Sequence, residues 1–175
     1  MNQGDEGAAL AAPLLGLRRA LNALDGVSFW IIVSVMAAMA ILVSLQVFYR
    51  YVLGSSIDSA DELSRLFFVW AMFLAIPQGI RYSVHVGIDL VVRALNPRRQ
   101  DVIFRVVSGA GLILMIIVAF VAWTAVADKW QELMPTLTVS AGLYYVPIFI
   151  CAVHSALHLL GQTLAGARFW GMEAP

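Results

Sequence analysis

The chain has 175 residues, of which 61% are hydrophobic and only 13% are charged, and its mean hydropathy is +0.85. Its 11 basic and 11 acidic residues sum to a formal charge of zero, which argues against a nucleic-acid partner and against a polybasic protein bound at a membrane surface. The apolar fraction excludes an ordinary water-soluble globule of this size. The composition predicts an all-α integral membrane protein of a single domain.

The first 26 residues lack the pattern of a cleavable signal peptide, because Asp5 and Glu6 stand where positive charge is required. Leucines recur there at spacings of three and four, at positions Leu14, Leu17, Leu21 and Leu24. This spacing predicts a cytoplasmic tail (1–26) that carries a short amphipathic helix on the membrane surface, with an unstructured tail as the alternative.

A membrane domain is predicted over 27–165, followed by a second cytoplasmic tail over 166–175. Four apolar stretches in this domain are long enough to cross a hydrocarbon core of about 30 Å. The expected spans cover residues 27–49, 62–82, 104–127 and 143–164. Asp25 and Ser28 are interpreted as start signals of the first span. Trp70 falls inside the second span, so its indole N–H requires a protein or water partner.

Basic residues are concentrated on one side of the four expected spans. Arg18 and Arg19 precede the first span, and Arg168 follows the last. The connection between the second and third spans carries Arg81, Arg93, Arg98, Arg99 and Arg105. The other two connections contain more acids than bases. The positive-inside rule therefore predicts that both termini and the middle connection are cytoplasmic.

The middle connection has a helical pattern of its own. Arg81, His85, Asp89 and Arg93 recur at steps of four, so Asp89 can pair with Arg93 and with a protonated His85 on one helix face. An apolar stripe accompanies this ladder. We expect an amphipathic interfacial helix over about 84–95, as a continuation of the second span.

Three histidines raise the question of a haem site. His154 and His158 are four residues apart and share one face of the last span, whereas His85 lies at the cytoplasmic end of the second. Two imidazoles at one depth can ligate haem in a four-helix bundle, which keeps a haem-binding membrane anchor of a respiratory enzyme as an alternative. Hydrogen bonding between helices is the other interpretation. No nucleophile or phosphate-binding motif is present, and we expect neither an enzyme nor a catalytic, cofactor or metal site.

Acids near the bilayer centre are expected in a transporter that works alone, and the first, third and fourth spans carry none in their interior. This argues against a small autonomous exporter. Asp61, Glu62 and Arg65 gather at the outer start of the second span. The two acids can be favoured by the dipole of a helix N-terminus. Alternatively, the three residues can form an intersubunit polar contact. The pattern favours a scaffold that binds another membrane protein.

Several short motifs follow one another in a specific order. Arg50-Tyr51 closes the first span, Asp61-Glu62-Leu63-Ser64-Arg65 leads into Phe67-Phe68-Val69-Trp70, and Arg81, His85, Asp89 and Tyr145-Val146-Pro147 follow. This ordered set resembles the small membrane subunit of tripartite ATP-independent periplasmic (TRAP) transporters. Ser59 departs from the pattern, because the family has a tryptophan ahead of the acidic pair.

The resemblance implies a four-span subunit of a bacterial or archaeal cytoplasmic membrane, with both termini inside. Its partners are the lipid bilayer, a much larger permease subunit and a periplasmic solute-binding protein. The permease holds the substrate site and uses the sodium gradient, so this chain itself binds no cofactor. The resemblance also implies that the solute carries a carboxylate and that this chain acts as the static scaffold. The candidate structural or subunit-interface polar residues are Arg50, Asp61, Glu62, Arg65, Arg81, His85 and Asp89.

Overall fold

The computed structural model describes residues 12–55, 57–81 and 97–165. The helices are α1 (Ala12–Val52), α2 (Asp58–Arg81), α4 (Pro97–Lys129), the short 3-10 helix η2 (Ala141–Tyr144) and α5 (Val146–Ala165). Four of them are long and apolar enough to cross a membrane, and no strand occurs among the described residues. The predicted all-α class with four membrane-spanning helices is confirmed.

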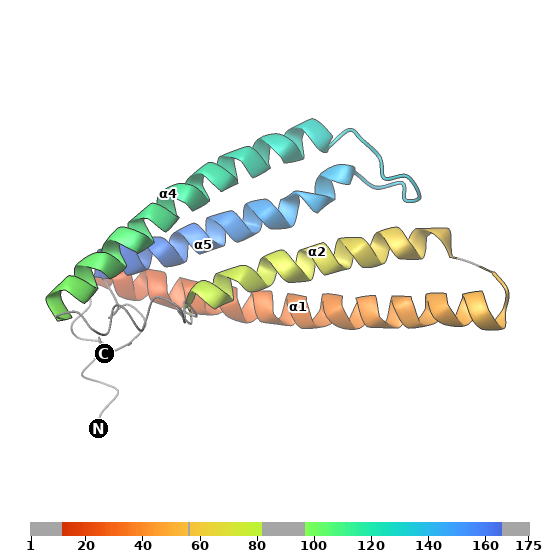
Figure 1. Ribbon diagram of the computed structural model, residues 1–175, viewed down its shortest axis with the longest axis horizontal. Coiled ribbons are helices and arrows are strands. Elements are labelled where there is room, and N and C mark those ends of the chain that lie inside the picture. Colours follow the sequence, from red (N-terminus) through yellow and green to blue (C-terminus); the bar gives the residue numbers. More distant parts are fainter. Residues whose placement is uncertain (1–11, 56, 82–96, 166–175) are drawn as a thin grey trace, which may run out of the picture.

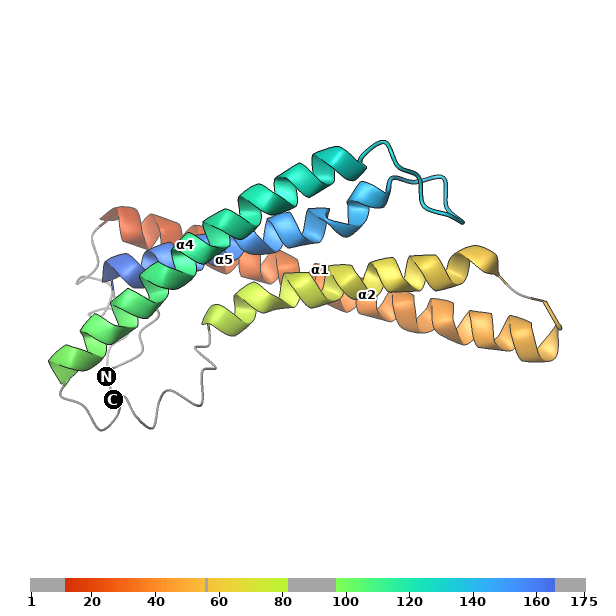
Figure 2. The same cartoon turned by 45° about the horizontal axis from the view of Figure 1, so that its top comes forward.

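The four long helices form two antiparallel pairs, α1 with α2 and α4 with α5 (Figure 1). The pairs meet through contacts of α5 with α2 and, to a smaller extent, with α1. The start of α1, the end of α2, the start of α4 and the end of α5 lie at one end of the molecule. From there the two pairs diverge toward the opposite end, as Figure 2 also shows.

Helix α1 is continuous over 41 residues and merges the expected surface helix with the expected first span. At a rise of 1.5 Å per residue it is about 60 Å long, roughly twice the hydrocarbon core. The interpretation of Asp25 and Ser28 as start signals is wrong, because both lie inside α1 and are buried. With Leu21 they form a buried stripe at spacings of four and three.

Gly54 ends α1 with a left-handed backbone, φ +62°. The amide of Ser55 donates to the carbonyl of Tyr49, six positions earlier, across 3.2 Å and so satisfies a carbonyl at the end of the helix. Glycine adopts this conformation without the steric penalty of a side chain. The cap turns the chain sharply toward the start of α2.

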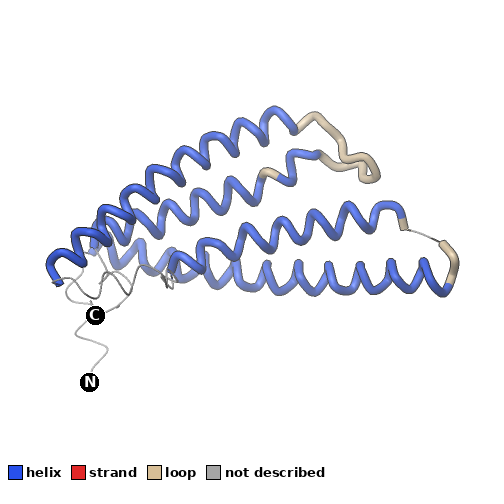
Figure 3. Tube along the Cα trace, viewed as in Figure 1, coloured by secondary structure: helices blue, strands red, loops and turns tan. Residues whose placement is uncertain are grey.

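The connection between α4 and α5 is held by its own backbone hydrogen bonds and is drawn in tan in Figure 3. An isolated antiparallel bridge joins Leu133 to Ser140, and the Met134 amide donates to the Val139 carbonyl across 2.9 Å. The Ser140 hydroxyl then accepts from the Gly142 amide and caps η2. This connection extends beyond the end of the α4–α5 pair (Figure 3).

The buried core is small for a chain this apolar. Large side chains on α1 and α4 stay exposed along most of both helices, among them Trp30, Ile41, Ile113, Ile117 and Phe120. Lipid or a partner protein covers such faces in a membrane, where helices associate through close packing.

The expected tails over 1–26 and 166–175 and the interfacial helix over 84–95 lie wholly or partly outside the described residues. His85 and Asp89, which were predicted to lie in that helix, are outside the described residues.

Candidate functional site

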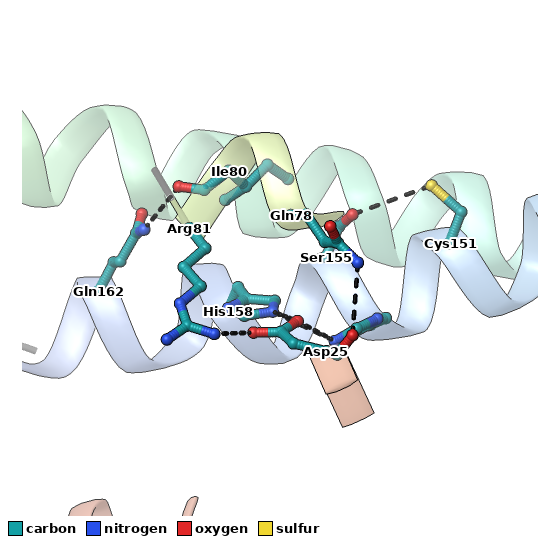
Figure 4. A network of polar contacts seen from close by, with 9 residues as sticks. Asp25, Gln78, Ile80, Arg81, Cys151, Ser155, His158 and Gln162 are labelled. Carbon is teal, nitrogen blue, oxygen red and sulfur yellow. Dashed lines mark hydrogen bonds and ion pairs between the residues drawn. The ribbon is translucent and has the colours of Figure 1, made fainter. Parts of the chain in front are cut away.

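A buried polar cluster joins α1, α2 and α5, and Figure 4 shows its contacts. Asp25 of α1 is its centre and is only 5% exposed. Its Oδ2 atom lies 2.8 Å from Nη1 of Arg81, the last residue of α2. Its Oδ1 atom lies 3.1 Å from Nε2 of His154 and 3.1 Å from Nε2 of His158, both on α5. One carboxylate therefore joins three of the four long helices.

The two histidines contact each other as well as Asp25. Because His154 and His158 are one helical turn apart, their rings lie side by side, with centroids 4.8 Å apart and Nε2 atoms 3.2 Å apart. Both rings are buried. Two axial ligands of haem must approach the iron from opposite faces of the porphyrin. His154 and His158 lie on one helix and both direct Nε2 toward Asp25, which disfavours the haem-anchor alternative.

Further hydrogen bonds hold the backbones around the cluster. Gln78 donates to the Asp25 carbonyl across 3.3 Å, and Gln162 donates to the Ile80 carbonyl across 3.2 Å. Arg105 of α4 donates to the Leu164 carbonyl near the end of α5 across 2.9 Å. All four long helices are thus linked at this end by polar contacts.

A second polar contact lies at the opposite end, where α2 begins. The Glu62 carboxylate accepts from the Thr136 amide across 2.8 Å and also from the Thr136 hydroxyl. The Tyr144 hydroxyl donates to the Glu62 carbonyl across 3.1 Å. Trp70 donates its indole N–H to the Leu143 carbonyl across 3.0 Å, which confirms that this side chain needs a protein partner. These bonds hold the α4–α5 connection against α2.

The other predicted polar residues are distributed differently. Arg50 lies in the last turn of α1 and is exposed. Arg65 pairs with Asp61 across 3.2 Å, but the two side chains are 69% and 71% exposed, so the pair contributes little within this chain. The Glu62 carboxylate is directed to Thr136. Among the predicted residues that the structure describes, Arg81 is the one that enters the buried cluster.

Sequence reasoning missed Asp25 as a site residue, although a signal was present. Asp25 stands four residues after Leu21, on the leucine face of an amphipathic helix, where an acid is costly unless a partner neutralises it. The pair His154 and His158 was recognised, but the helix that it faces could not be derived from spacing within α5.

Four membrane-spanning helices, linked by polar contacts at one end and with α2 bonded to the α4–α5 connection at the other, define a multi-pass membrane protein. Residues 39–169 match the model of the family described as tripartite ATP-independent periplasmic transporters, DctQ component. The chain belongs to this family of small TRAP permeases. It is a transporter subunit of the inner membrane and not an enzyme.

Curated relatives agree with this assignment. Two TRAP transporter small permease proteins of Haemophilus influenzae are similar to the chain. The first is 27% identical over 137 residues, which are 78% of this chain and 85% of the relative. The second is 28% identical over 119 residues, 66% and 72% of the two chains.

A third relative is the isethionate TRAP transporter permease protein DctMQ of Oleidesulfovibrio alaskensis. It is 27% identical over 146 residues, which are 77% of this chain but only 22% of that longer permease. This relative supports a large permease as the partner of the small one within a TRAP system.

Proposed function

We propose that this chain is the scaffold of a TRAP secondary transporter and holds the large permease subunit in the membrane during uptake of a carboxylate-bearing solute. The observation that carries the proposal is the exposed apolar surface that runs along α1 and α4. Such long, uncovered faces are suited to a large membrane partner, because close side-chain packing drives helix association in lipid.

The contacts of the buried polar groups support a structural role for this chain beside a larger, ion-coupled subunit. The buried acid and histidines of the described spans contact one another and Arg81, and these contacts tie three helices together, with His154 near the middle of α5. We expect the larger subunit to hold the substrate site and to use the sodium gradient, while a periplasmic binding protein delivers the solute.

We also propose that both termini lie in the cytoplasm. The excess of arginine on the connections at one end supports this orientation, as does the common end shared by the start of α1 and the end of α5. Fluorescent-protein fusions at either terminus should be bright in cells, and alkaline phosphatase fusions at the same positions should be inactive. The reverse pattern at either terminus would contradict the orientation.

Co-purification and uptake together test the scaffold role. The affinity-tagged chain, co-expressed with a large TRAP permease subunit from the same organism, should purify with that permease in a stable complex. Proteoliposomes of the complex, supplied with the binding protein, should take up a carboxylate solute when sodium is higher outside. Isethionate serves as a competing solute that lacks the carboxylate.

Two outcomes would reject the proposal. The large permease could support undiminished uptake without this chain, or this chain could purify alone and transport by itself. Preference for isethionate over every carboxylate tested would reject only the solute class.

A further inference from the structure

Three potential metal ligands converge in the buried cluster. Oδ1 of Asp25, Nε2 of His154 and Nε2 of His158 form a nearly equilateral triangle with sides of 3.1, 3.1 and 3.2 Å. The three residues are 5%, 5% and 0% exposed. A triangle this small allows few well-aligned hydrogen bonds, because each shared proton can point toward only one neighbour.

The triangle has the dimensions of one face of a tetrahedral metal site. Zinc binds imidazole nitrogen and carboxylate oxygen at about 2.0–2.2 Å, which separates neighbouring ligand atoms by roughly 3.3 Å. Two histidines four residues apart on a helix are a recurrent way to present a pair of such ligands. Two imidazoles and one carboxylate favour a transition metal over sodium, magnesium or calcium, which prefer oxygen.

The surroundings are also those of a metal centre. Arg81 holds the Oδ2 atom of Asp25 at 2.8 Å and thereby directs Oδ1 toward the histidines. Outer contacts of this kind orient ligands in known metal sites. The Arg81 side chain is 28% exposed, so it lies between the cluster and the molecular surface. Water or a small anion can complete the fourth position.

We propose that Asp25, His154 and His158 bind one divalent transition-metal cation of the zinc class and that this ion ties α1 to α5. This inference goes beyond the transport role and reverses the expectation that the chain binds no metal. The ion would cross-link the two helix pairs at the end where they meet.

Metal binding by the purified full-length chain tests the site, with a histidine-free affinity tag to avoid adventitious binding. After incubation with zinc and removal of the excess, elemental analysis should find about one zinc per chain. His154→Gln and His158→Gln should each weaken zinc binding at least about 100-fold, because each removes a direct ligand. His85→Gln, which removes the third histidine, and Cys151→Ser should retain one zinc.

Cobalt gives a second measurement on the wild-type chain and does not depend on variants that fold poorly. Tetrahedral cobalt should produce visible absorption bands, and zinc should abolish them. Well-folded wild-type chain without stoichiometric zinc and without these bands would overturn the proposal. Equal zinc content in the wild type and in both His→Gln variants would do the same. Neither result bears on the scaffold role, because no transport is measured.

Discussion

Replacing Asp25 by alanine is expected to lower the free energy of unfolding by about 2–4 kcal/mol, because the change leaves Arg81 and two buried histidines without their carboxylate. The lower half of this range allows for the partial access of Arg81 to water. The measurement is equilibrium unfolding of the detergent-solubilised chain in SDS, with a chelator present so that metal does not contribute.

Asp61→Ala is the matched control for Asp25→Ala. It removes the same functional group from an ion pair with arginine, but both partners are mostly exposed, so the expected cost is less than about 1 kcal/mol. A double variant in which Asp25 and Arg81 are replaced by leucine and methionine should recover much of the lost stability, since no charge is then left buried. Equal losses from Asp25→Ala and Asp61→Ala would show that the cluster is not a stabilising contact.

Replacing Gly142 by alanine is expected to cost about 1–3 kcal/mol through overpacking. A Cβ atom at this position would lie 3.1 Å from the Ser140 hydroxyl, 3.1 Å from Cε3 of the Trp130 ring and 3.2 Å from the Val126 carbonyl oxygen. The serine can rotate away and the half-exposed Trp130 ring can shift, but the Val126 carbonyl belongs to the backbone of α4 and cannot move without the helix. The loss should appear in the same unfolding assay and as faster proteolysis of the α4–α5 connection.

Gly79→Ala provides the control for this substitution. Gly79 lies in α2 with nothing within 4 Å of an added Cβ atom, so alanine should leave stability unchanged or raise it by up to about 1 kcal/mol. If both substitutions behaved alike, the close packing around Gly142 would not matter for the stability of the connection.

The spans and the family could be derived from the sequence because both depend on local order along the chain. A bilayer fixes the length of an apolar stretch, so hydropathy alone identified four helices. The motif order around Arg50, Asp61 and Arg81 indicated the TRAP small subunit, which the family match confirmed. The requirement of Trp70 for a partner was predictable for a similar reason, since a lone indole N–H in a membrane is costly.

The partners of these groups were decided only by the tertiary structure. Leu143 accepts from Trp70 although it lies on a segment 73 positions further along the chain, and Asp25 meets His158 across 133 positions. Periodicity within one helix shows which residues share a face, but it does not show which other helix that face meets. Asp25 was therefore taken for a local helix-start signal, whereas packing of α1 against α2 and α5 makes it the centre of a buried polar cluster. An apolar sequence with zero net charge determined a four-helix membrane subunit, and long-range packing determined where its few charges meet.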